Sequence, residues 1–162
     1  MYNLFYKSKI GLLEIKCDES HLIEVLLCTK KGNDNPNEIC FETKNQLELY
    51  FNNKLKTFDL PIKLIGTDFQ KEVWKKLDTI PFGKTISYQE LANLIKKPKA
   101  VRAVANAVGK NKLLIIIPCH RIIGKDNSLT GFSAGLENKI FLLRHENFTV
   151  NFHENIAKST IK

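Results

Sequence analysis

Three polar residues lie together inside the most apolar stretch of the chain, "LLIIIPCHRIIG" at 113–124. Pro118 is followed by Cys119, His120 and Arg121, with aliphatic residues on both sides. A buried polar group without a partner costs about 1–3 kcal/mol, so these side chains need partners or a chemical role. A cysteine acts as a nucleophile in its thiolate form, which a nearby histidine helps to produce. The stretch therefore predicts a buried strand that presents Cys119 as a reactive thiol.

The histidine of this stretch needs partners of its own. Adjacent residues of an extended chain point to opposite sides, so Cys119 and His120 need a bridging water or a local bend between them. His120 also needs a group that fixes the tautomer of its ring. We expect this group to be Glu146, at the end of the predicted helix "LENKIFLLRHE", with His145 as the alternative. The glycine-spaced loop "LTGFSAG" would let a ligand approach backbone amides closely. On these residues alone, an inert buried cysteine and a core histidine are the alternative interpretation.

Three helices are predicted upstream of the reactive stretch. Thr67 and Gln70 form a capping-box pattern that opens a helix ending at 81–83, and Ser87 with Glu90 forms a second one. The second helix, "YQELANLIKK", ends at Pro98. The third, "KAVRAVANAV", has an apolar face and is expected to stop with Gly109 in the left-handed conformation. The tight connection between the last two predicts a helix-turn-helix, with two ordinary packed helices as the alternative.

The outward face of this helix pair is basic. Six cations lie within 17 residues and no acidic residue is among them: Lys96, Lys97, Lys99, Arg102, Lys110 and Lys112. Cations beside DNA neutralise phosphates and release counterions. The third helix is also rich in alanine, at positions 100, 103, 105 and 107, which would let it approach a groove closely. The pattern favours contact with DNA over a merely solvated face.

The first 64 residues have a different character. The runs "YNLFYKS", "GLLEIKC" and "LIEVLLC" predict three strands, with a hairpin turn at Lys9-Ile10-Gly11. After a polar loop, "ETKNQLELYFNNK" predicts a helix. No polar groups gather around a reactive one here, so we expect a structural domain.

The composition sets the class of protein. The 162 residues are 43% hydrophobic and carry a formal net charge of +8, which favours an anionic partner. No apolar run reaches the roughly 20 residues of a membrane span, and the N-terminus lacks the pattern of a signal peptide. The four cysteines form no C-x-x-C pair. We therefore expect an intracellular protein (cytoplasmic, or nuclear in a eukaryote) with reduced thiols, no metal site and no membrane contact.

"IPCHRII", preceded by "ISYQELA" and by a basic helix with Arg102, resembles the O6-alkylguanine-DNA alkyltransferases, also called methylated-DNA–protein-cysteine methyltransferases. The likeness runs over residues 66–146, and the first 64 residues resemble the variable N-terminal domain of this family by size and strand content. The resemblance implies irreversible transfer of an alkyl group from O6-alkylguanine in DNA to Cys119, once per molecule and without a cofactor. It also implies a water-linked relay from Cys119 through His120 to Glu146, with Asn111 holding the active-site turn.

The resemblance implies roles for residues outside the relay as well. Tyr88 would crowd the phosphate and donate a proton to the leaving guanine, and Arg102 would enter the base stack where the flipped guanine has left. Further expected contacts are to DNA, by Ser87, Lys99, Ala103 and Arg121, and to the base, by Pro118, Ile122, Phe132 and Ser133, in addition to Tyr88.

Three other functions share parts of this pattern. An alkyltransferase-like protein that binds lesions without transfer has the same DNA-binding frame, but those relatives replace the cysteine. A helix-turn-helix regulator would use the basic helices and leave "PCHR" without a role. A cysteine hydrolase could combine Cys119 with His120 and Glu146, and would turn over repeatedly.

The expected architecture is α/β in the wider sense (α+β). It has a small strand-rich structural domain at 1–64 and a mostly helical DNA-binding and alkyl-transfer domain with a helix-turn-helix at 65–150. A polar tail follows at 151–162. The expected partner is double-stranded DNA carrying alkylated guanine, with alkylated thymine as an open further substrate, and we expect a monomer.

Overall fold

The computed structural model describes residues 1–126, 128–129 and 131–147, and the tail expected at 151–162 lies outside the described residues. The chain divides into two compact units. The first comprises Met1–Ile65 together with Lys112–Ile116, and the second comprises 66–111 and the chain from 117 onward. The fold is α+β, as predicted, because the strands of the first unit precede a mostly helical second one.

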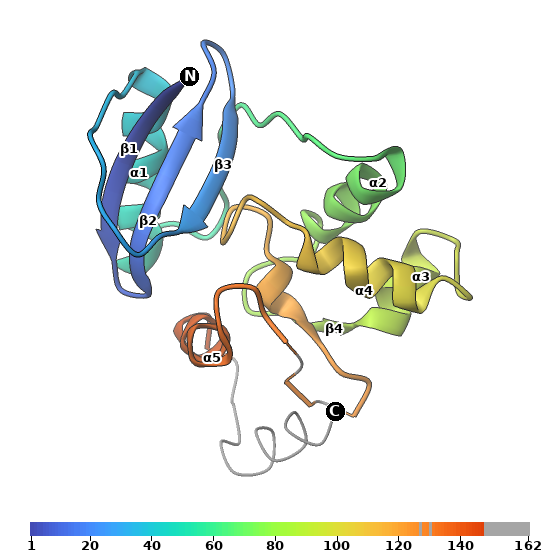
Figure 1. The fold of residues 1–162 in the computed structure, drawn as a ribbon. Helices are drawn as coiled ribbons and strands as arrows, with labels where there is room; N and C mark the ends of the chain where they lie inside the picture. Colours follow the sequence, from blue (N-terminus) through green and yellow to red (C-terminus); the bar gives the residue numbers. More distant parts are fainter. Residues whose placement is uncertain (127, 130, 148–162) are drawn as a thin grey trace. The chain divides into compact units, whose positions relative to one another are not determined.

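The first unit is an antiparallel sheet with one helix packed on it (Figure 1). Strands β1 (Tyr2–Ser8), β2 (Gly11–Cys17) and β3 (Leu22–Leu27) lie in the order β1-β2-β3. Ser8 faces Gly11 across the predicted hairpin turn, where Gly11 adopts a φ of 124° that side chains rarely tolerate. The three predicted strands and their turn are therefore confirmed.

Helix α1 (Glu38–Phe51) begins four residues before the predicted start at 42. Asn37 caps it by accepting a 3.0 Å hydrogen bond from the backbone nitrogen of Cys40. Because Asn37 lies in a segment rich in polar residues, the sequence does not distinguish this cap from the other residues of the loop. The Cys40 thiol lies 3.3 Å from that of Cys17, and both residues are fully buried. Both cysteines belong to the apolar core of this unit. Burial, together with the neighbouring thiol, raises the pKa of Cys17.

The strand expected at 113–117 does not form. Leu113 makes a single bridge to Val25, with hydrogen bonds from Val25 N to Lys112 O (2.8 Å) and from Leu114 N to Val25 O (3.0 Å). The chain then turns at once, because Ile115 has a φ of 71°, which is a strained value for a β-branched residue. A turn replaces the predicted strand, and the apolar character of this segment reflects burial and not pairing.

The second unit holds the remaining elements. These are α2 (Asp68–Leu77), β4 (Ile86–Ser87), α3 (Tyr88–Leu94), α4 (Val101–Gly109), the 3-10 turn η1 (Cys119–Arg121), β5 (Ile122–Ile123) and α5 (Leu136–His145). Both predicted capping boxes are present, at Thr67 with Gln70 and at Ser87 with Glu90. The expectation for Gly109 is wrong, because Gly109 is the last residue of α4 and Lys110 caps it with a φ of −92°.

Helices α2 and α4 are joined in the core of this unit. The indole Nε1 of Trp74 donates a 2.8 Å hydrogen bond to the carbonyl oxygen of Ala107, and the contact is buried. Among the described residues, no helix has the length and hydropathy needed to cross a membrane.

We expect Trp74→Phe to lower the free energy of unfolding by about 0.5–1.5 kcal/mol, because it removes the buried indole donor and leaves the Ala107 carbonyl with the backbone N–H of Lys110 alone. Urea unfolding followed by circular dichroism measures this change. Lys75→Met, at an exposed neighbouring position of α2, is the control. Equal stability of Trp74→Phe and the wild-type protein would contradict this role of the indole.

Candidate functional site

The reactive cysteine lies on a short helical turn and not on a strand. Cys119 is the first residue of η1, directly after Pro118, and is 4% exposed. The side-chain nitrogen of the buried Asn111 donates hydrogen bonds to the carbonyl oxygen of Ile117 (2.9 Å) and to the Cys119 sulfur (3.2 Å). One amide thus holds the backbone before the cysteine and the sulfur itself. The turn supplies the local bend that the sequence required.

The histidine and arginine of the turn converge on one carboxylate. Nε2 of His120 lies 2.6 Å from Oε2 of Glu146. Arg121 donates from Nε to Oε1 (2.7 Å), from Nη2 to Oε2 (3.0 Å) and from Nη1 to the Ile80 carbonyl (2.6 Å). The backbone nitrogen of Gly83 also donates to Oε1 of Glu146 at 3.2 Å. All three side chains are buried, so Glu146 is a fully enclosed acceptor with four donors.

The charge states follow from this geometry. Burial would raise the pKa of Glu146, but the hydrogen bonds from His120 and Arg121 outweigh burial and hold the pKa below its usual range. Burial, together with the charges of Arg121 and Lys139, lowers the pKa of His120 against the raising effect of Glu146, so the imidazole is neutral at pH 7. A neutral ring beside a carboxylate carries its proton on Nε2. Nδ1 is therefore an acceptor. Among the buried side-chain nitrogens and oxygens of the described residues, it alone has no hydrogen-bond partner.

The thiol is not ionised at rest. Burial raises the pKa of Cys119, while the Asn111 hydrogen bond, the charge of Lys139 and nearby backbone amides act in the opposite direction. A base that takes the thiol proton during the reaction is therefore useful, and Nδ1 of His120 has the right protonation state for it.

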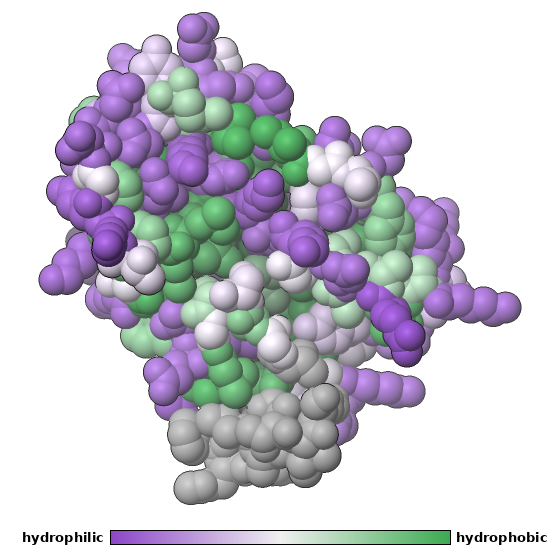
Figure 2. Space-filling view, viewed as in Figure 1, coloured by the Kyte–Doolittle hydropathy of each residue, from purple (hydrophilic) through white to green (hydrophobic). Residues whose placement is uncertain are grey.

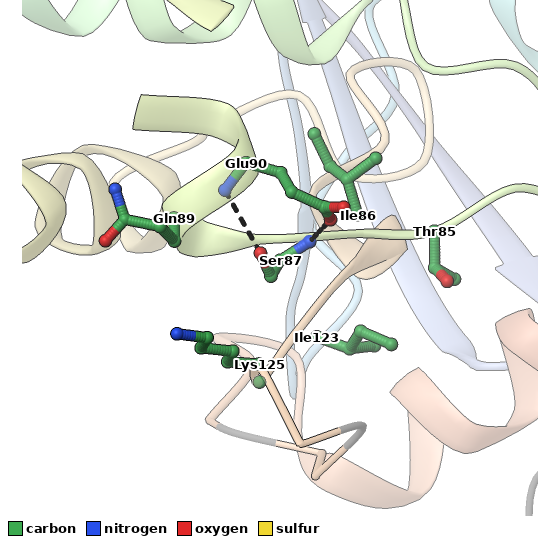
Figure 3. Close-up of a pocket in the computed structure, with 8 residues that line it drawn as sticks. Thr85, Ile86, Ser87, Gln89, Glu90, Ile123 and Lys125 are labelled. Atoms are coloured by element: carbon green, nitrogen blue, oxygen red, sulfur yellow. Dashed lines mark hydrogen bonds between the residues drawn. The ribbon is translucent and has the colours of Figure 1, made fainter. Parts of the chain in front are cut away.

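Tyr88 is connected to the reactive turn through a pair of short parallel strands. Strand β4 pairs with β5, with Ile86 opposite Ile122 and Ser87 opposite Ile123. Cys119 precedes β5 by the length of the turn, and Tyr88 follows β4 directly as the first residue of α3. The capping box of Ser87 fixes that junction, as Figure 3 shows. The pairing thus anchors the nucleophile and the half-buried Tyr88 to one frame.

A cavity of about 330 Å³ opens beside this strand pair (Figure 3). Its lining residues are Thr85, Ile86, Ser87, Gln89, Glu90, Ile123, Gly124 and Lys125. Cys119 is not among them. The cavity therefore adjoins the N-terminal end of α3 and does not enclose the thiol.

The predicted contacts to the base are distributed over two segments. Pro118 and Ile122 flank the reactive turn and are buried. Phe132 is half-buried and Ser133 is exposed on the loop before α5, where Gly135 N donates to the Phe132 carbonyl at 2.9 Å. The structure thus places Pro118 and Ile122 directly at the thiol-bearing turn.

Some of the cations on the basic helix pair are exposed, and others are engaged elsewhere in the structure. Lys99, Arg102 and Ala103 are exposed, and Figure 2 shows hydrophilic side chains along α4 on the visible face. Lys97 is engaged within the unit, since its Nζ lies 2.5 Å from a carboxylate oxygen of Glu72. Lys112 belongs to the first unit. The cations of α4 and its flanks, and not all six, form the candidate DNA-binding face.

The expected contact of Arg121 with DNA is contradicted by the structure. Arg121 is 5% exposed, and its guanidinium is bound to Glu146 and to the Ile80 carbonyl. A buried carboxylate requires such a bidentate partner, which explains why an arginine follows the Cys-His pair. His145, the alternative to Glu146, stacks on Phe141 instead, with ring centroids 6.1 Å apart.

One member of the buried cluster is missed by sequence reasoning. Lys139 is 1% exposed, and its Nζ donates to the carbonyl of Ile122 at 2.6 Å. It stands among the buried Ile140, Leu142 and Leu143 of α5. A lysine at a buried position of an apolar helix face is the signal that could have identified it.

We expect Glu146→Gln to lower the free energy of unfolding by about 3 kcal/mol or more at pH 7, because Arg121 would remain buried without its counter-charge. The stabilisation from a carboxyl with a lowered folded-state pKa is present above its unfolded-state pKa and is lost as pH falls through the folded-state pKa. The difference between the two proteins should therefore shrink below about pH 4, the unfolded value for glutamate.

Urea unfolding at a series of pH values measures this difference. Glu137→Gln, at an exposed position of the same helix, is the matched control. A gap between Glu146→Gln and wild type that does not change between pH 7 and pH 3 would contradict the assigned charge state.

Comparison with known proteins gives a consistent result for both parts of the chain. Residues 1–64 match the family model described as "6-O-methylguanine DNA methyltransferase, ribonuclease-like domain", and residues 68–148 match the one described as "6-O-methylguanine DNA methyltransferase, DNA binding domain". The methylated-DNA–protein-cysteine methyltransferase of Methanosarcina acetivorans is 44% identical, over 90% of this chain and 98% of its own length. That of Methanosarcina barkeri is 54% identical over 65% of this chain, which spans 66% of the relative.

Solved structures agree with these matches. The chain is similar to Mycobacterium tuberculosis OGT in complex with DNA, with a TM-score of 0.83 and 40% identity over 90% of this chain and 92% of that one. It is also similar to an O6-methylguanine DNA methyltransferase from Methanococcus jannaschii, with a TM-score of 0.66 and 28% identity over 91% and 95% of the two chains. Matched by both family models and by a relative along nearly its full length, the chain belongs to the 6-O-methylguanine DNA methyltransferase family.

Proposed function

We propose that this protein repairs DNA by moving an alkyl group from the O6 atom of guanine to the sulfur of Cys119, irreversibly and once per molecule. The observation that carries this proposal is a buried thiol on a turn whose next two residues, His120 and Arg121, are locked onto Glu146. A fixed thiol suits an in-line displacement, which needs the reacting atoms at about 3–3.5 Å.

The site residues account for every proton and bond in this reaction. The Cys119 proton passes, by way of a water molecule, to Nδ1 of His120, and the imidazolium that forms is stabilised by Glu146 on its other nitrogen. The sulfur then forms a bond to the alkyl carbon as the carbon–oxygen bond breaks. The electron pair stays on the guanine, which takes up a proton from Tyr88 or from solvent. The product is a thioether, which has no hydrolytic route back to the thiol.

Access to the thiol requires that the base leave the duplex. Cys119 is almost fully buried, and a base inside a double helix cannot reach such an atom unless it is flipped out, at a cost of a few kcal/mol. Arg102 is exposed on α4 and would occupy the gap in the stack. Lys99 and Ala103, which are also exposed, would face the DNA backbone and groove.

The geometry favours transfer over the other interpretations. The Cys119 sulfur is held by Asn111, which a protein that only binds lesions would not need. A transcription regulator would leave the buried cluster without a role. One relative, the Escherichia coli protein named bifunctional transcriptional activator/DNA repair enzyme Ada, is 45% identical to this chain over 80% of its residues, and the match spans 37% of that protein. We propose that the protein acts as a monomer inside the cell and that its substrate is double-stranded DNA carrying alkylated guanine. Alkylated thymine is a further substrate to be tested.

Mass spectrometry of the intact protein tests the reaction. After incubation with a duplex that carries one O6-methylguanine, we expect one thiol hydrogen to be replaced by a methyl group, and peptide mapping should place that group on Cys119. The gain should stop at one group per protein even with excess duplex. Cys119→Ser should bind the duplex and gain nothing.

Other outcomes would assign a different function. Binding of the lesion without a gain in mass on Cys119 would indicate a damage-binding protein. Repeated turnover of an ester or amide substrate would indicate a hydrolase.

We expect Arg102→Ala to slow repair of the duplex much more, by about tenfold or beyond, than reaction with free O6-methylguanine base, because only the duplex must be unstacked. Single-turnover rates with both substrates measure this. Lys84→Ala, at an exposed position outside α4, is the control. Equal losses on both substrates would contradict the role of Arg102 in base flipping.

A further inference from the structure

The second unit contains a buried lysine that the reaction described above does not use. Lys139 is the one lysine among the described residues whose side chain is buried, with 1% exposure. The buried charged side chains of the described chain are three, Arg121, Lys139 and Glu146, and all three come from the reactive turn or from α5 and its cap. A buried ammonium is costly unless something opposite stabilises it, so its location next to a nucleophile calls for a reason.

Helix α5 contacts the reactive segment at two points. Lys139 and Glu146 are seven residues apart, which is close to two helical turns, so both lie on one face. Glu146 binds His120 and Arg121 inside the turn, while Nζ of Lys139 donates to the carbonyl of Ile122 at its exit. The same face of one helix thus holds the turn at two successive positions.

The charges of the cluster act on the thiol unequally. The charge of Glu146 is balanced by Arg121 through two hydrogen bonds. The Ile122 N–H donates to the Cys119 carbonyl oxygen and closes the turn, so Nζ of Lys139, which donates to the Ile122 carbonyl, lies beside the turn that carries the thiol. Its charge acts to lower the pKa of Cys119 against the larger effect of burial. The effect is reciprocal, since burial lowers the pKa of Lys139 to about 8 while Cys119 acts to raise it. At pH 7 most Lys139 side chains therefore carry their charge, which can stabilise a thiolate as it forms on Cys119.

We propose that the ammonium of Lys139 is a positioning group that stabilises the Cys119 thiolate as it forms and fixes the end of the reactive turn through the Ile122 carbonyl. The proposal rests on the function proposed above for Cys119. It assigns to His120 the removal of the proton and to Lys139 the stabilisation of the negative charge that remains on sulfur.

The test must separate the charge of Lys139 from its hydrogen bond. Lys139→Gln keeps an N–H that can donate to the Ile122 carbonyl but removes the charge, and Lys139→Met removes both. The probe is iodoacetamide, which alkylates thiolates without any need for DNA. Peptide mapping separates Cys119 from Cys28, the half-exposed cysteine of the first unit, and the rate at Cys119 is followed from pH 6 to pH 9.5.

The other ionisable groups of the buried cluster are the same in all these proteins: His120 and Arg121 from the turn, Glu146 from the end of α5, and Asp78 from the end of α2, which interacts electrostatically with Arg121. Lys75→Gln, at an exposed position of α2, removes one positive charge from the surface of the same unit and is the matched control.

We expect iodoacetamide to alkylate Cys119 about 10- to 100-fold more slowly in both Lys139 variants than in the wild-type protein at pH 7. A neighbouring opposite charge lowers the pKa of a thiol by about one to two units, and both variants lose this effect. The rate at Cys28 and the Lys75→Gln profile should be unchanged. The advantage of the wild-type protein should decline as pH rises above about 8, where Lys139 loses its proton. A Lys139→Gln protein with the wild-type rate and pH profile would overturn the proposal, since it would leave Lys139 with a hydrogen-bonding role alone.

A measurement on the wild-type protein keeps the proposal testable if the variants do not fold, which circular dichroism would reveal. The ¹³Cε resonance of Lys139 locates its titration midpoint by nuclear magnetic resonance. Beyond that midpoint, the rate at Cys119 should rise less steeply than the roughly tenfold per pH unit of an isolated thiol below its pKa. An unbroken tenfold rise through the Lys139 midpoint would contradict the proposal.

Parallel assays with the O6-methylguanine duplex distinguish this proposal from the one on which it rests. If the wild-type protein takes no methyl group from the duplex, yet Lys139→Gln slows iodoacetamide, the repair function fails and the effect of Lys139 on the thiol stands. If the wild-type protein repairs the duplex and Lys139→Gln matches it in both assays, only the role of Lys139 fails.

Discussion

The enclosed carboxylate of Glu146 is the constraint on which the rest of the site depends. A buried carboxylate is tolerated only when its charge is compensated and its lone pairs are filled, and here two donors from Arg121, one from His120 and one backbone amide do this. Once these bonds form, the orientation of the imidazole and the course of the turn are fixed. The neighbouring Cys119 then has one position relative to both.

The positions of the candidate site residues follow from a few short-range links. Asn111 ties the sulfur to the backbone that precedes it, and the β4–β5 pairing ties the end of the reactive turn to the start of α3, where Tyr88 lies. Helix α5 supplies both Glu146 and Lys139. Each link spans only a few atoms, so the unit can hold an otherwise irregular segment rigid without a long strand beneath it.

The interior and the surface of the second unit differ in how their charges are arranged. The interior gathers opposite charges that compensate one another within hydrogen-bond distance, where low polarity strengthens them. The surface around α4 carries cations exposed to solvent, where they attract phosphates over a distance and are screened by salt. Arg121 and Arg102 illustrate the contrast: the same side chain stabilises the fold in one place and is free for the ligand in the other.

Local patterns in the sequence determined most of the helices and strands and pointed to Cys119 as the nucleophile. Capping boxes, the three strand-like runs of the first unit and the cluster at 118–121 depend on neighbours within a few residues, so they can be recognised without the fold. The choice of Glu146 as the partner of His120 followed from residue type and was confirmed by the 2.6 Å contact. Only the tertiary structure decided the turn at Ile115, the inward direction of Arg121, the pairing of Lys97 with Glu72 and the burial of Lys139. These depend on contacts with residues distant in the chain, and a side chain such as arginine or lysine suits either water or a buried partner until the fold brings one within reach.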